Sequence, residues 1–167
     1  MILYSEILKD FQKQKVKYIV VGGLAFNLLG GERSTSDLDI LVEMSDRNLR
    51  KIVNILKTQA YTVRQPVDPM GIADKKIRYD WIKNKHMKAF NFYKDKTLKE
   101  VDIIIESPVS FAQAEKDVII VSVGEMKLPV ISIKNLIKMK QVAGRDCDKS
   151  DILQLKAIQQ LRKKYDR

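Results

Sequence analysis

Three aspartates stand in otherwise apolar segments of the sequence. Asp37 and Asp39 lie two positions apart in the segment SDLDILV, and Asp102 lies among aliphatic residues in VDIII. Alternate side chains of a strand share a face, so Asp37 and Asp39 are expected side by side, with Leu38 and Ile40 on the opposite, buried face. Two carboxylates on one face repel each other unless a cation, an arginine or a proton intervenes. The spacing leaves two interpretations, a cation site or the wet outer face of an edge strand.

Asp102 favours the cation site. A single aspartate in an aliphatic strand is unfavourable unless the strand is at an edge or the carboxylate has a partner. If this strand pairs beside residues 38–42, Asp102 completes a three-carboxylate cluster with Asp37 and Asp39. Carboxylate oxygens suit Mg²⁺, and such a cluster can hold two Mg²⁺ ions that clamp the attacking and leaving oxygens of a phosphoryl or nucleotidyl transfer.

Gly22 and Gly23 follow the β-branched segment KYIVV and precede a short apolar segment, residues 24–29. Glycines let the backbone approach a ligand closely, and the first N–H groups of a helix have no partner within it. The turn is therefore a candidate site for phosphate. The alternative is an ordinary tight turn from strand to helix.

Helical and strand-like segments are interspersed along the chain. Helical spacing of apolar residues, with Ser45 or Asp46 as one cap, predicts helices over 2–14, 24–29, 46–59, 71–88, 132–142 and 148–165. Short β-branched or aromatic runs predict strands over 17–21, 38–42, 61–64, 89–93, 101–105, 117–123 and 127–133. We expect an α/β (α+β) fold: one domain over residues 1–167, a small mixed sheet flanked by helices, and a helical C-terminal part over 132–167.

The order of these motifs resembles a known group of enzymes. Gly-Gly, then Asp-x-Asp on the next strand, then a single Asp in a later aliphatic strand is similar to the minimal members of the polymerase-β-like nucleotidyltransferase superfamily. The likeness is closer to the AbiEii-like bacterial nucleotidyltransferases, in which a segment like GGLAFNLLGGERSTSDLDILV precedes one like LIKMKQVAGRDCDKSDILQL. It covers about residues 18–42, 99–106 and 135–155, whereas residues 64–98 match nothing in it.

The resemblance implies a nucleotidyltransferase-like fold and Mg²⁺-dependent transfer of a nucleoside monophosphate from an NTP to an acceptor hydroxyl, releasing pyrophosphate. It implies that Asp37 and Asp39 hold the metals of a two-metal site, and that Asp102 shares the catalytic metal or deprotonates the acceptor. The residues it implies for binding the nucleotide are Gly22, Gly23, Arg33, Thr35, Ser36, Lys140 and Arg145.

The C-terminal segment carries four residues of the family's K…GR…D…D pattern, Lys140, Arg145, Asp148 and Asp151. The first two would compensate the charge of the triphosphate; the alternative is a pair of ordinary basic residues at a helix end. Asp148 and Asp151 can also be caps of the last helix, the interpretation we favour for Asp148.

The distribution of charge along the chain indicates what kind of molecule the protein binds. The chain carries 31 Lys and Arg against 21 Asp and Glu, a net charge of +10, with basic segments over 75–99 and 127–167 around an acidic segment, 100–126. This pattern favours a polyanion such as RNA or a nucleoside triphosphate, although lysine-rich helices can be simply solvated faces. The leading prediction is therefore an RNA acceptor such as the end of a tRNA, in a toxin with a cognate antitoxin or in phage defence. The alternatives are a small-molecule acceptor, as in antibiotic-modifying relatives, a protein acceptor, and a non-catalytic nucleotide-binding module or antitoxin.

Composition predicts a cytoplasmic location and no membrane segment. No run reaches the roughly 18 apolar residues that a spanning helix needs. The N-terminal segment is interrupted by charged residues, unlike a secretory signal. The single cysteine, Cys147, suits a reducing compartment.

Overall fold

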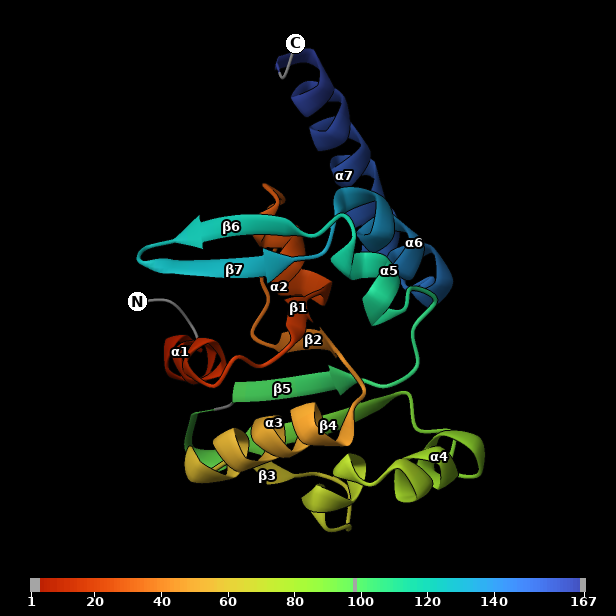
Figure 1. The fold of residues 1–167 in the computed structure, drawn as a ribbon. Helices are drawn as coiled ribbons and strands as arrows, with labels where there is room; N and C mark the ends of the chain where they lie inside the picture. Colours follow the sequence, from red (N-terminus) through yellow and green to blue (C-terminus); the bar gives the residue numbers. More distant parts are fainter. Residues whose placement is uncertain (1–3, 98, 166–167) are drawn as a thin grey trace.

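The centre of the protein is a mixed seven-stranded sheet with the order β3-β4-β5-β2-β1-β7-β6 (Figure 1). This computed structural model describes residues 4–97 and 99–165. The strands are β1 (Tyr18–Val20), β2 (Leu38–Val42), β3 (Thr62–Val63), β4 (Ala89–Lys94), β5 (Lys99–Ile104), β6 (Ile119–Val123) and β7 (Met126–Val130). The helices are α1 (Ser5–Lys13), α2 (Gly22–Leu28), α3 (Asp46–Thr58), α4 (Lys75–Lys83), α5 (Phe111–Glu115), α6 (Ile133–Ala143) and α7 (Asp146–Tyr165). The predicted α/β class and mixed sheet are confirmed.

The sheet register aligns polar positions of three neighbouring strands. β2 and β5 are parallel, and Asp39 lies opposite Asp102. β4 is antiparallel to β5, and its Asn91 lies opposite Asp102. The central strand β2 therefore carries a carboxylate whose neighbours on the next two strands are also polar.

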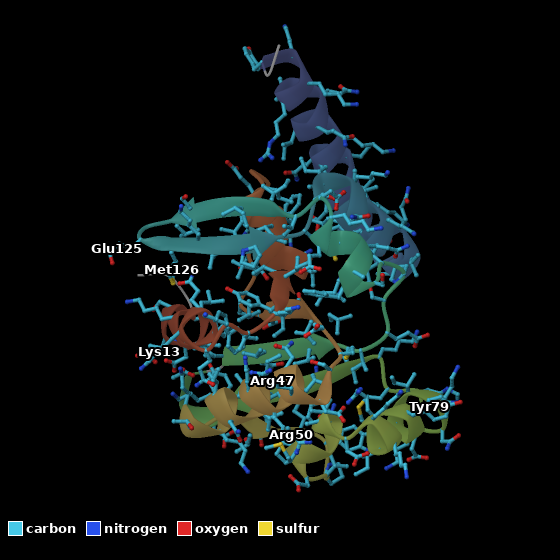
Figure 2. The ribbon with its side chains drawn as sticks, in the orientation of Figure 1. Lys13, Arg47, Arg50, Tyr79, Glu125 and Met126 are labelled. Atoms are coloured by element: carbon cyan, nitrogen blue, oxygen red, sulfur yellow. The ribbon has the colours of Figure 1, made fainter. Side chains whose placement is uncertain are left out.

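Apolar residues on alternate strand positions and on one helix face make the core. Leu38, Ile40 and Ile103 are fully buried. Helix α3 turns Leu49 and Ile52 inward in the same way, while its charged residues such as Arg47 and Arg50 point to solvent (Figure 2). Such a one-sided apolar face is typical of a helix that covers a sheet.

The C-terminal helices form a separate layer beside the strand ends. α6 begins at Ser132, whose hydroxyl accepts a hydrogen bond from the Asn135 backbone N–H, and ends at Gly144 in the left-handed conformation. α7 packs against α6, and its last turns extend beyond the sheet (Figure 1). Among the described residues, no helix is long and apolar enough to cross a membrane.

Several predicted elements differ from those of the structure. Residues 71–88 are not one helix, because Asp74 caps a new helix by accepting hydrogen bonds from the N–H groups of Lys76 and Ile77. The preceding residues Pro69–Ala73 form a 3₁₀-helix. α2 begins at Gly22 rather than after the glycine pair, and α5 was not predicted. Residues 2–3 of the first predicted helix lie outside the described residues.

Candidate active site

Asp39 and Asp102 form a half-buried carboxylate pair at the centre of the sheet. Burial, followed by the charges of Asp102 and Asp37, raises the pKa of Asp39 to about 6. Burial also raises the pKa of Asp102, and a hydrogen bond from the Asn91 side-chain amide partly offsets this rise, with Nδ2 2.7 Å from Oδ1. A cation beside these groups would relieve their repulsion.

The backbone of Gly22 comes close to the Asp39 carboxylate. Gly22 has φ +67°, and a Cβ added there would lie 1.8 Å from Oδ2 of Asp39. The next N–H, of Gly23, hydrogen-bonds to Asp39 and lowers its pKa in part. The glycine pair therefore packs against the carboxylate, and the N–H of Gly23 already has a protein acceptor.

The loop before β2 holds the other predicted phosphate-binding residues. A Cβ added at Gly23 would lie 2.6 Å from Thr35 Oγ1 and 3.2 Å from Arg33 Nη2, so Thr35 and Arg33 cover this glycine. The Ser36 hydroxyl donates a hydrogen bond to Asp37 over 2.8 Å. Thr35 thus lies beside Gly23 and Ser36 beside Asp37, and their role in binding phosphate stays a prediction.

Asp37 stands apart from the Asp39–Asp102 pair. In the part of the chain that the structure describes, no group of three or more His, Cys, Asp or Glu side chains is arranged to hold a metal ion. Asp37 is nonetheless close enough for its charge to raise the pKa values of both Asp39 and Asp102. The chemistry of the three carboxylates fits a divalent cation, and their role as metal ligands stays a prediction.

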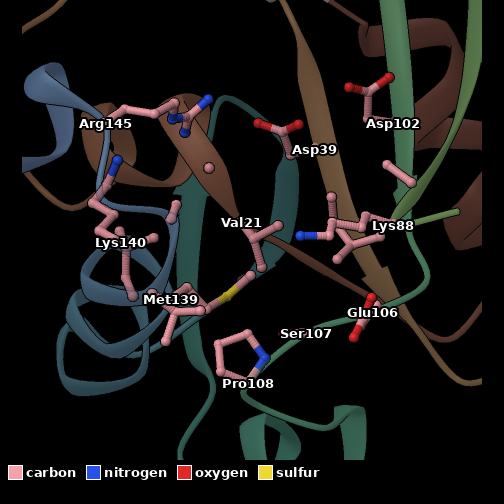
Figure 3. A pocket seen from close by; sticks show the side chains of 16 residues that line it. Val21, Asp39, Lys88, Asp102, Glu106, Ser107, Pro108, Met139, Lys140 and Arg145 are labelled. Atoms are coloured by element: carbon pink, nitrogen blue, oxygen red, sulfur yellow. The ribbon is translucent and has the colours of Figure 1, made fainter. Parts of the chain in front are cut away.

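A cavity of about 570 Å³ opens beside the carboxylate pair, between the sheet and α6 (Figure 3). Of the predicted site residues, it is lined by Gly22, Asp39, Asp102, Lys140 and Arg145. Its wall does not include Gly23, Arg33, Thr35, Ser36 or Asp37. The remaining lining is mostly apolar and comes from Val21, Ala89, Ile104, Pro108, Leu136, Met139, Val142 and Ala143.

Lys140 is the centre of a buried charge cluster. Its side chain is 4% exposed, and its Nζ lies 2.6 Å from Asp151 Oδ2 and 3.3 Å from Asp148 Oδ1. Asp151 also binds Arg33 at 3.0 Å, and Asp148 binds the Arg145 guanidinium at 3.0 Å. Two carboxylates thus compensate the charge of Lys140, and the cluster joins the loop after α2 to α6 and α7.

Arg145 donates hydrogen bonds to Asp148 from both its backbone N–H and its guanidinium. Burial alone would raise the pKa of Asp148, but the Arg145 hydrogen bond and the charges of Arg145 and Lys140 hold it below its ordinary value. The Arg145 backbone N–H also donates to Asp148, but α7 begins at Asp146, so Asp148 lies inside the first turn and not at the predicted cap position. The Arg145 side chain is 65% exposed and lines the cavity, where its charge lowers the pKa of Asp39.

Sequence reasoning missed three residues of the site. Asn91 could have been found, because it is the polar residue in the middle of the strand segment AFNFY. Lys88 and Glu106 line the cavity, whereas Asn91 only contacts Asp102, and no local pattern marks these two residues. Lys88 and Glu106 come together where β4 begins and β5 ends. There the N–H groups of Ile105 and Glu106 donate to the Lys88 carbonyl at 2.9 and 3.1 Å.

Residues 4–158 match the family model described as aminoglycoside-2''-adenylyltransferase. LnuA, a lincosamide antibiotic adenylyltransferase solved with lincomycin bound, is 19% identical, with a TM-score of 0.60 over 91% of this chain and 93% of that chain. ANT(2'')-Ia in complex with adenylyl-2''-tobramycin is 13% identical, with a TM-score of 0.58 over 98% and 97%. A Thermotoga maritima protein described as a nucleotidyltransferase is 20% identical, with a TM-score of 0.55 over 89% and 86%. These structures share the fold, and no curated protein matches the chain.

Proposed function

Because the chain belongs to the aminoglycoside-2''-adenylyltransferase family, and thus to the nucleotidyltransferases, we propose that it transfers AMP from ATP to the hydroxyl of a small molecule. The observation that carries the proposal is the Asp39–Asp102 pair in the wall of a cavity of about 570 Å³. This volume is within the range of small-molecule sites.

The chemistry needs a base for the acceptor hydroxyl, and we assign this role to Asp102. Its Oδ1 accepts the Asn91 amide, which orients the carboxylate, and its raised pKa suits a group that takes up a proton. As Asp102 accepts the hydroxyl proton, the acceptor oxygen bonds to the α-phosphorus of ATP. The bond from the α-phosphorus to the bridging oxygen breaks, and pyrophosphate leaves with that electron pair.

We assign compensation of the phosphate charge to groups beside Asp39 and on the Arg145 side of the cavity. Mg²⁺ held by Asp37 and Asp39 would supply positive charge to the phosphate oxygens. Arg145 adds a guanidinium that Asp148 holds in place, and Gly22 leaves the space beside Asp39 free of a side chain. Lys140 contributes indirectly, because it fixes Asp148 and Asp151 and thereby the position of Arg145.

A small acceptor fits the cavity better than RNA does. Eight of the lining residues are apolar, which suits a small acceptor with an apolar body better than a nucleic-acid backbone. The net charge of +10 is the observation that still favours RNA. An RNA acceptor, a toxin role and a closer relation to the AbiEii-like enzymes therefore stay predictions from sequence.

The test is transfer of label from α-labelled ATP in the presence of Mg²⁺, with lincomycin, tobramycin or total RNA as acceptor. We expect label in a small molecule and release of pyrophosphate, and we expect Asp39→Asn to lower the rate by a factor on the order of 10³. Asp95→Asn, at an exposed position outside the cavity, is the matched control. Label that enters only RNA, or no transfer to any acceptor, contradicts the proposal.

A further inference from the structure

One lysine of the cavity has no role in the chemistry above. We propose that Lys88 selects the acceptor by charge, so that the enzyme modifies a hydroxyl compound with an apolar body and at most one positive charge, and rejects polyamines. This inference rests on the proposed function and names the substrate class of the same site.

Lys88 lines the cavity and is also exposed to solvent, as Lys85 is, but Lys85 lies outside the cavity. Lys88 immediately precedes β4, and its carbonyl accepts hydrogen bonds from the N–H groups of Ile105 and Glu106, just after β5. These bonds fix the backbone at the end of the strand that carries Asp102. Figure 3 shows the Lys88 side chain extending from this point into the cavity, with its amine directed toward Val21.

Lys88 is also the cation of the cavity wall whose charge no carboxylate compensates. Across the described residues, ion pairs within 4 Å involve Lys140 and Arg145 but not Lys88. A positive charge without a partner repels a second positive charge brought near it, and such repulsion is a common source of specificity.

The carboxylates of the cavity cannot offset this repulsion for a polyamine. Asp39 and Asp102 are engaged by the chemistry proposed above, which leaves Glu106 as the acidic residue of the lining that is free to bind an ammonium. One carboxylate beside one lysine can accept one ammonium group. Several ammonium groups would leave an excess of positive charge in a small cavity.

In-line geometry places the acceptor on the side of Lys88. The attacking and leaving oxygens lie on opposite sides of the phosphorus. If pyrophosphate departs toward the end formed by Gly22 and Arg145, the attacking hydroxyl must approach from the β5–β4 side. Asp102 and Lys88 lie on that side. On that side the lining also includes Ala89 of β4 and Ile104 of β5, which favour an apolar body.

The experiment measures acceptor binding by calorimetry, with Mg²⁺ and α,β-methylene-ATP present and no turnover. The probes are lincomycin, which has one amine and an apolar chain, and tobramycin, a polyamine. We expect the wild type to bind lincomycin more tightly, and Lys88→Glu to tighten tobramycin binding at least tenfold. Lys85→Glu makes the same charge change at an exposed lysine outside the cavity and should leave both affinities unchanged.

Three results would overturn the inference. They are tighter binding of tobramycin than of lincomycin by the wild type, unchanged tobramycin binding in Lys88→Glu, and a loss of nucleotide affinity in Lys88→Glu, which would make Lys88 a nucleotide ligand. Failure of the proposed function is distinguishable, because it is seen in the wild type as absence of pyrophosphate release with any acceptor. A fluorescence melting curve for each variant establishes that it is folded.

Discussion

Asp39 is an acid that folding makes harder to ionise. Its pKa rises from 3.8 to about 6, first through burial and then through the charges of Asp102 and Asp37. The folded protein therefore binds a proton at Asp39 more tightly than the unfolded chain does. Between about pH 4 and pH 6 this residue contributes stability that is lost as the pH rises, the reverse of the usual aspartate in an ion pair. A bound cation would restore the charged form.

The first prediction concerns metal binding and pH. Because a metal ion binds the carboxylate and not the acid, Mn²⁺ used as a probe for Mg²⁺ should lose affinity as the pH falls through about 6. The expected loss approaches tenfold per pH unit below that value. Titration of the nucleotide-free protein with Mn²⁺, followed by electron paramagnetic resonance at pH 5, 6 and 7.5, measures it. Equal affinity at all three values would show that Asp39 is not a ligand.

The second prediction concerns a buried hydroxyl. The Tyr4 hydroxyl lies within hydrogen-bond distance of the Ser36 and Glu100 carbonyls and accepts the Glu100 N–H. It thereby ties the residue before Asp37 to the beginning of β5. Tyr4→Phe keeps the ring but leaves these groups unpaired, so it should lower kcat about tenfold and stability by about 1–2 kcal/mol.

Tyr18→Phe is the matched control for this change. The Tyr18 hydroxyl is buried and has no hydrogen-bond partner in the described part of the chain, so its removal should leave stability unchanged or raised. Both variants are compared by urea unfolding and by steady-state kinetics. Equal kcat values for the two would remove Tyr4 from any role in positioning the carboxylates.

Elements with strong local signals were predictable from the sequence. Ser45 caps α3 as expected, since its hydroxyl accepts the Asn48 N–H. α5 carries a complete capping box between Ser110 and Gln113, and this local signal was overlooked. The division of residues 71–88 was harder to predict, because the segment is only weakly amphipathic and its apolar pattern does not mark the Asp74 cap.

The third prediction concerns the start of α2. Gly22→Ala places a methyl group 1.8 Å from the Asp39 carboxylate and forces alanine to φ +67°. Gly144→Ala imposes nearly the same φ, +65°, but its nearest neighbour is 3.9 Å away. Both variants should lose about 1 kcal/mol to backbone strain, but Gly22→Ala should lose more and also at least 100-fold in kcat. Comparable activities in the two variants would contradict the close packing of Gly22 on Asp39.

At the scale of the molecule, buried charges join the two halves of the site. Lys140 on α6 lies between Asp148 and Asp151 of α7, and Asp151 reaches Arg33 in the loop before β2. The Lys140 amine also lies 5.7 Å from the Phe26 ring of α2. The sequence marks these residues only by family resemblance. Arg33 and Asp151 are 118 positions apart, and local spacing does not encode which distant charges meet.

The fourth prediction tests this cluster. Lys140→Met leaves Asp148 and Asp151 buried with fewer partners and should lower the free energy of unfolding by about 3 kcal/mol. It should also raise the KM for ATP, because Arg145 loses part of its support. Lys149→Met removes an exposed lysine–aspartate pair of α7 and should change neither quantity. Similar unfolding midpoints for the two variants would refute the role of the cluster.

The position of Lys140 on α6 has a consequence for how such an enzyme diversifies. The helix is anchored through Lys140, while neighbouring residues, Leu136, Met139 and Val142, form one wall of the cavity. The reactive carboxylates belong to β2 and β5, on other elements. Natural variation on the exposed turns of α6 can therefore alter which compounds are accepted while the reaction itself is inherited unchanged, so related sequences should differ most along this wall.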